Sequence, residues 1–255
     1  MNKWLAVTAF LAGGVMGIAG LGGCSSKVES TTVGGDSKPA AVESKHEVAP
    51  TPQIMSTELR YNRALKLYDE GSYEEAEKEL EIVCDAWPKF SKPFKHLART
   101  QLKTGKTEEA LENALDAAEM NPKDGTIDNV IGLAYMDLDD FDSAETAFRT
   151  AISKNPTFVW AYNNLGYLLI QKKQFADARD VLTEGGKIEK APSVLFNNLG
   201  IALESTGDTV GAKAAFAKAV EMDPTQVNAS TNLSRLDVQE PQVEDQKIAQ
   251  VTESK

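Results

Sequence analysis

Small and apolar residues recur every 34 residues between about residue 57 and residue 226. In each unit an alanine is preceded, twelve residues earlier, by another small residue. In four of the five units it is followed, four residues later, by a large apolar one. The five alanines are Ala76, Ala110, Ala144, Ala178 and Ala212. A regular period of this length is typical of solenoids. It predicts five units, at 57–90, 91–124, 125–158, 159–192 and 193–226.

The pattern resembles the tetratricopeptide repeat, in which small residues lie where two helices touch and a proline ends the unit. Prolines follow the same spacing, at Pro88, Pro122, Pro156 and Pro224. The third unit matches best, with Gly132, Tyr135, Ala144, Phe148 and Pro156. The resemblance implies an all-α fold, a right-handed α-α superhelix (solenoid) in which each unit is a pair of antiparallel helices.

The turns inside the five units are expected at Gly71, Gly105, Asp139-Asp140, Lys173 and Gly207. The fourth unit departs from the pattern, because Gly185-Gly186 falls within its second helix. An interior glycine costs about 1 kcal/mol relative to alanine, so this helix is expected to be weak or distorted. Residues 227–238 continue the register as a capping helix, and residues 239–255 read as a loose charged tail.

The N-terminus has the pattern of an export signal. Lys3 is the only charged residue before Lys27, and an apolar, glycine-containing stretch lies between them. The tetrapeptide ending at Cys24, Leu21-Gly22-Gly23-Cys24, resembles the lipobox of bacterial lipoproteins. The resemblance implies that residues 1–23 are removed and that Cys24 is acylated through its thiol, with a lipid such as palmitate. An ordinary secretory signal or an uncleaved anchor is the alternative.

Ser25 after the cysteine is similar to sorting signals for the outer membrane, which implies a lipid-anchored protein of the bacterial cell envelope facing the periplasm. Residues 24–56 lack apolar periodicity and contain three prolines, so they read as a disordered tether. A flexible chain of this length has a mean reach of about 30 Å.

The composition excludes several classes of function. The net charge of −11 argues against a nucleic-acid partner. Two cysteines cannot build a disulfide framework, and two histidines leave little for a metal site. No catalytic set or phosphate loop appears among the repeats, so we expect no enzyme activity and no cofactor other than the lipid on Cys24. Cys84 is expected to be a small buried residue, a regulatory thiol being the alternative.

In the repeat family, first helices line a concave groove that binds peptides or proteins. Carrying the groove positions over to this chain predicts a set of partner-binding residues: Lys92, Lys95, Arg99, Lys103, Asn129, Trp160, Asn163, Asn164, Tyr167, Asn197 and Asn198.

Two features stand out in this set. Lys92, Lys95, Arg99, Lys103 and Lys106 lie on one helical face, which predicts a site for an anionic group of a partner. The alternative is a solvated face balanced by the acidic helix of the same unit.

The second feature is the asparagines, whose amides can pair with an extended peptide backbone. The alternative is that they only hold helices together.

The sequence therefore predicts a non-catalytic, membrane-tethered scaffold that binds protein or peptide ligands of the cell envelope. An assembly factor of the pilus or secretin type is the leading interpretation. An adaptor that docks cell-wall enzymes is the alternative, and an enzyme is the least favoured.

Overall fold

The computed structural model describes residues 56–239, which form eleven helices and no strand. The predicted signal peptide, Cys24, the predicted tether and the predicted tail after residue 239 lie outside the described residues. The helices are α1 Thr57–Asp69, α2 Tyr73–Ala86, α3 Ser91–Thr104, α4 Thr107–Met120, α5 Gly125–Asp137, α6 Phe141–Lys154, α7 Val159–Gln171, α8 Phe175–Gly185, α9 Ser193–Ser205, α10 Thr209–Met222 and α11 Val227–Gln239.

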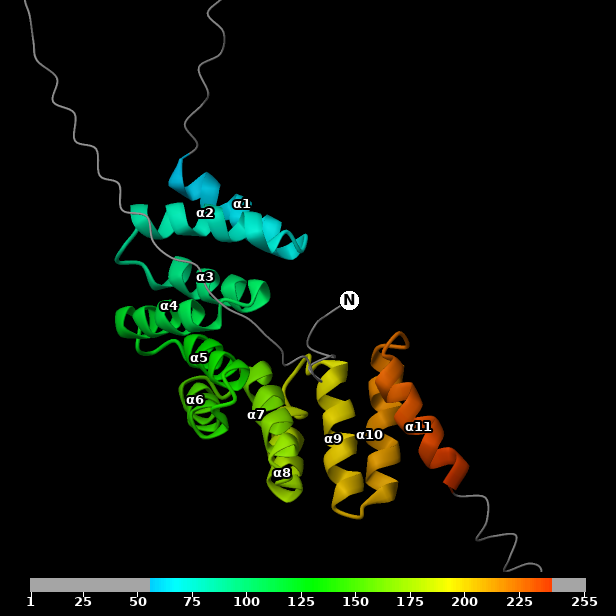
Figure 1. Cartoon of the computed structure of the whole chain (residues 1–255). Coiled ribbons are helices and arrows are strands. Elements are labelled where there is room, and N and C mark those ends of the chain that lie inside the picture. Colours follow the sequence, from blue (N-terminus) through cyan, green and yellow to red (C-terminus); the bar gives the residue numbers. More distant parts are fainter. Residues whose placement is uncertain (1–55, 240–255) are drawn as a thin grey trace, which may run out of the picture. The chain divides into compact units, whose positions relative to one another are not determined.

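Successive helices pair as antiparallel hairpins that stack in chain order, from α1–α2 to α9–α10, with α11 closing the series (Figure 1). Every described helix contacts only helices one or two positions away in the chain. The first helices α1, α3, α5, α7, α9 and α11 each contact the next in this series, whereas no second helix contacts another second helix. The stack therefore curves with the first helices inside. We call their surface the first-helix face. The all-α solenoid predicted from the sequence is confirmed.

The repeated small residues form the contacts within and between the hairpins. All five alanines of the 34-residue register are fully buried. In three hairpins a glycine lies directly against a large side chain of the second helix: Gly132 against Phe148, Gly166 against Leu182, and Gly200 against Phe216. Because these glycines have no side chain, the first helix packs with its backbone against the buried rings and branched side chains of the second.

The turns within the hairpins lie where the sequence predicts them. Each contains one residue with positive φ. Three hairpins use a glycine there, as in Gly105 with φ of 80°. Asp139 and Lys173 take the same place with φ of 59° in the third and fourth hairpins. Aspartate tolerates this conformation better than most residues, whereas lysine at Lys173 gains no such local support.

Helix α8 differs from the other second helices, because it ends at Gly185 after 11 residues where they have 14. The predicted cost of an interior glycine does not apply, since Gly185 is the last helical residue. A Cβ there would come within 2.7 Å of Tyr162 Cβ and 2.9 Å of Leu195 Cδ1. Glycine is required at this position so that α8 can pack against α7 and α9.

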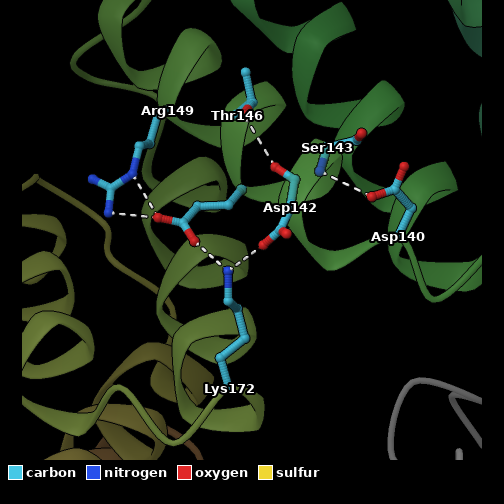
Figure 2. A network of polar contacts seen from close by, with 7 residues as sticks. Asp140, Asp142, Ser143, Thr146, Arg149 and Lys172 are labelled. Atoms are coloured by element: carbon cyan, nitrogen blue, oxygen red, sulfur yellow. Dashed lines mark hydrogen bonds and ion pairs between the residues drawn. The ribbon is translucent and has the colours of Figure 1, made fainter.

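Ion pairs reinforce the stacking of hairpins. At the end of α7, Lys172 Nζ lies 2.8 Å from carboxylate oxygens of both Asp142 and Glu145 on α6, so it joins the fourth hairpin to the third (Figure 2). The hydrogen bond from Lys172 is the main reason why the pKa of Glu145 is lowered. Asp140 caps α6 by accepting a 3.1 Å hydrogen bond from the Ser143 backbone N–H.

Candidate functional site

The five cations of the predicted basic stripe have different surroundings. Lys92 is exposed at the start of α3. Lys95 is largely buried, and its Nζ lies 2.9 Å from Asp124 Oδ2 and 2.8 Å from Thr126 Oγ1. Burial raises the pKa of Asp124, but hydrogen bonds from Thr126 and Lys95 outweigh it and hold this pKa below its usual range. Lys95 thus links α3 to the start of α5.

Lys103 and Lys106 also interact with groups of neighbouring hairpins. Burial and Arg99 lower the pKa of Lys103, while the charge of Asp137 at the end of α5 raises it. Lys106 Nζ lies 2.9 Å from Glu77 Oε1 on α2. Lys95 and Lys106 therefore form their described ion pairs with acids outside α4. The alternative to partner binding had instead expected the acids of α4 to neutralise these lysines.

Arg99 is exposed and lies over an aromatic ring. Its guanidinium carbon is 5.1 Å from the centroid of Tyr68 on α1. One turn earlier, His96 packs edge-on against Tyr61, with ring centroids 5.8 Å apart. Burial lowers the pKa of His96 to about 4, with Arg99 as the largest of the nearby charges that act in the same direction. His96 is therefore neutral at pH 7. The exposed positive charges of α3 on the first-helix face are those of Lys92 and Arg99.

Asparagines occupy the fifth and sixth residues of several of the predicted 34-residue units. Their side chains form hydrogen bonds that connect one first helix to the next. Asn164 donates to Asn129 Oδ1 (2.9 Å), Asn163 donates to Asn164 (3.2 Å), and Asn198 donates to Asn163 (3.1 Å). A second link runs from Asn232 to Asn197. Asn129, Asn163, Asn197 and Asn198 are buried, and Asn164 is partly buried. These bonds give the amides a packing function that the sequence could not separate from peptide binding.

The two predicted aromatic residues of the fourth unit lie on α7. Trp160 is 47% exposed at the start of the helix, and Tyr167 is partly buried in its middle. An indole with half of its surface in water is unusual for a packing residue. Trp160, Lys92 and Arg99 therefore remain the most accessible members of the predicted partner-binding set.

The opposite side of the stack carries a pocket that the sequence did not predict. It has a volume of about 760 Å³ and lies over α7, between α6 and α8, with Ile152, Tyr162, Leu165 and Val181 among its apolar lining residues. Arg149 and Arg179 at its rim are each paired with an acid. Over residues 56–239, no cluster of three metal-ligating side chains occurs, and no helix combines the length and apolarity needed to cross a bilayer.

Comparison with protein-family models identifies the hairpins. Models described as "Tetratricopeptide repeat" match residues 129–158, 147–180 and 194–226. Residues 129–180 and 194–226 of the chain are therefore tetratricopeptide repeats. Proteins made of such repeats are in general protein-binding scaffolds without catalytic activity, and they bind protein or peptide partners. The matched segments include Trp160 and the asparagines from Asn129 to Asn198, but neither Asn232 nor the basic α3.

The chain is also similar to several known proteins. The chain is 25% identical over 169 residues to the BBSome complex member BBS4 of Bos taurus, which covers 66% of this chain but 32% of that protein. A crystal structure of a tetratricopeptide repeat protein from Thermus thermophilus matches with a TM-score of 0.62 and 22% identity, over 72% of this chain and all of the other.

The APC/C hetero-tetramer Cut9–Hcn1 matches with a TM-score of 0.65 and 16% identity, over 71% of this chain and 36% of the other. These structural likenesses establish the fold alone.

Proposed function

We propose that this protein is a membrane-tethered scaffold that binds peptide segments or partner proteins in the concave groove formed by its first-helix face. The observation that carries the proposal is the accessibility of Lys92, Arg99 and Trp160 on that face. Arginine and tryptophan are among the residues that most often anchor protein interfaces, and Lys92 adds positive charge on the same face. The preformed stack of hairpins also limits the ordering that the protein undergoes on binding.

The partner chemistry that fits this face is an acidic or carboxylate-bearing segment with an apolar residue. Lys92 and Arg99 would attract the anionic group, and Trp160, two hairpins further along, would contact apolar surface. Lys95 supports this arrangement indirectly, since its ion pair with Asp124 holds α3 against α5. The asparagines would contribute by holding the first helices in register, with any spare amide groups free for a peptide backbone.

The tether and the envelope location rest on the lipobox-like segment that ends at Cys24. We propose that acylation of Cys24 anchors the chain to the outer membrane on its periplasmic side. There the scaffold would assist assembly of a pilus or secretin complex. Metabolic labelling with an alkyne fatty acid tests this step: labelling should disappear in the Cys24→Ser variant. Undiminished labelling in that variant would remove the anchor from the proposal.

Crosslinking in native envelopes tests partner binding. A photo-crosslinking amino acid in place of Trp160 should trap a distinct partner, and the Lys92→Glu/Arg99→Glu double variant should lower the yield several-fold. Lys78→Glu, an exposed lysine on the second helix α2, is the matched control and should leave the yield unchanged. Pilin or secretin subunits among the trapped proteins would support the assembly role, whereas wall hydrolases would support docking of cell-wall enzymes. Equal trapping in all variants would contradict binding on this face.

A further inference from the structure

The connection between the first two hairpins differs from the equivalent connections along the stack. Three of these have a polar residue before the proline, at Asn121, Asn155 and Asp223, and in two of them its side chain accepts a hydrogen bond from a backbone N–H two residues later. The first connection instead reads Trp87-Pro88-Lys89-Phe90. An indole cannot accept such a bond, so the usual turn chemistry does not explain the tryptophan.

Packing explains Trp87 only in part. Its ring contacts Tyr61, with centroids 6.2 Å apart, and Phe90, with centroids 5.9 Å apart. Phe90 is nevertheless 61% exposed, and Leu59 in the first turn of α1 is 54% exposed. Their neighbours Lys89 and Lys92 are exposed as well. We call Leu59, Trp87, Lys89, Phe90 and Lys92 the aromatic–lysine edge.

The position of this edge follows from the antiparallel pairing of the helices. The start of α1, the end of α2 and the start of α3 lie on the same side of the stack (Figure 1). The residues that precede Ser56, including Cys24, therefore join the described helices at the aromatic–lysine edge. A lipid on Cys24 would attach the chain to the membrane through this edge of the stack.

We infer that the aromatic–lysine edge docks on an anionic lipid surface, an inference that rests on the proposed membrane tether. Exposed aromatic rings beside lysines are the combination that partitions to the boundary between headgroups and acyl chains. Lys89 and Lys92 carry positive charge in a chain of net charge −11, so they complement anionic headgroups where most of the protein is repelled by them. The docked state places the ring of Phe90 among the headgroups and turns the first hairpin toward the bilayer.

The same surface explains why the tether matters. Exposed Glu58 and Asp85 lie close to the edge in sequence and oppose binding to anionic lipid, so the contact is weak for a protein free in solution. A lipid on Cys24, 32 residues before Ser56, would raise the local concentration of lipid into the range where a weak contact is occupied. Docking would thereby orient the stack relative to the membrane.

Fluorescence quenching by brominated lipids tests the inference on the full, lipidated chain reconstituted in vesicles. Trp4 lies in the segment that is removed on lipidation, so one reporter variant keeps only Trp87 (Trp160→Phe), and its matched control keeps only Trp160 (Trp87→Phe). Trp87 should be quenched at least twofold more than Trp160 in vesicles with anionic lipid, and the difference should shrink in zwitterionic vesicles. Lys89→Gln/Phe90→Ser should abolish it, whereas Lys173→Gln/Phe141→Ser, at the opposite edge of the hairpins, should not.

Flotation of the same samples separates the two proposals. A protein that floats with the vesicles but shows equal quenching of Trp87 and Trp160 is tethered and not docked, which overturns the inference alone. A protein that does not float overturns the tether. In that case, titration of the Trp87 reporter with anionic vesicles still decides on the edge, because the absence of quenching at saturating lipid would overturn docking too. If a bound partner protein shields Trp87 and brominated lipid does not quench it, the edge binds that protein and not the membrane, which would also overturn the inference.

Discussion

The ring of Phe148 lies so close to Gly132 that a Cβ on this glycine would stand 2.5 Å from Phe148 Cε1. The same geometry recurs between Gly200 and Phe216, two repeats further along. In the first repeat the equivalent pair is Ala64 and Leu80, both fully buried. In these three repeats the larger side chain of the second helix accompanies the smaller residue of the first, whereas the second repeat pairs Ala98 with Ala114 and the fourth pairs Gly166 with Leu182.

Gly132→Ala should lower the free energy of unfolding by about 1–3 kcal/mol, because the added methyl group forces the Phe148 ring or the α5 backbone to shift. Combining it with Phe148→Leu reproduces the pair found in the first repeat and should recover part of the loss. Urea denaturation of the two single variants and the double variant gives the coupling energy. Additive losses would show that the two sites do not share the predicted contact.

Asn198→Ala should lower the free energy of unfolding by about 1–2 kcal/mol, since it leaves the buried Asn163 Oδ1 without the donor 3.1 Å away. Asn62→Ala is the matched control, because Asn62 has the same register position but is exposed on α1. The control should unfold at the wild-type temperature. If partner binding survives Asn198→Ala while the melting temperature falls, the amides hold the helices together and do not read the ligand.

His96 should make folding stability depend on pH. Its folded pKa of about 4 lies below the unfolded value of 6.5. The neutral ring therefore contributes stability that is present above pH 6.5 and is lost as the pH falls toward 4. Because the ring is only partly buried, we expect a loss of about 1–2 kcal/mol.

Denaturation of wild type and His96→Gln at several pH values between 7.5 and 4 measures this contribution. The wild-type advantage over the variant should shrink as the pH falls. Asp137, whose pKa burial raises to about 6, titrates over the same range with the opposite sign, but it is present in both proteins and cancels in the difference. A constant difference between the two proteins would show that His96 does not titrate as the structure requires.

Cys84 should be almost inert toward alkylating reagents in the folded protein. Burial, with smaller contributions from Asp85 and Glu81, raises the pKa of its thiol to about 12, so very little reactive thiolate exists at pH 8. In a Cys24→Ser chain it is the remaining thiol. Iodoacetamide should label it slowly under native conditions and fully in guanidinium chloride. Comparable rates in the two conditions would revive the regulatory-thiol interpretation.

The sequence allowed prediction of the fold because the repeat specifies backbone positions. Ala144, Gly132 and the positive-φ residues such as Gly105 each satisfy a steric requirement that only a few residue types meet, so their spacing shows the hairpins directly. The surroundings of Lys95 and Asn163 could not be read in the same way. A long or amide side chain can reach several neighbours, and only the stacked helices show that Lys95 meets Asp124 and that Asn163 meets Asn198.

The accessible members of the candidate site were predicted together with residues that have structural partners. A helical-face pattern places Lys92, Lys95 and Arg99 on the same side, but it does not distinguish a cation in water from one paired across a repeat boundary. The sequence placed a departure in the second helix of the fourth unit at Gly185-Gly186, but it could not show that the helix ends there or why. The effect of Gly185 depends on Tyr162 and Leu195, which approach it from two other helices.

Because described helices contact only those one or two positions away, a force applied at one end of the stack passes from helix to helix along it. A pull through the residues before Ser56 acts first on α1, which Arg60 holds to Glu79 of α2 across 2.8 Å. The first hairpin would peel away before the force reaches α5 or α7, since no contact bypasses the intervening helices. The helices that carry Trp160 and the asparagines are thereby the last to feel a force applied before Ser56.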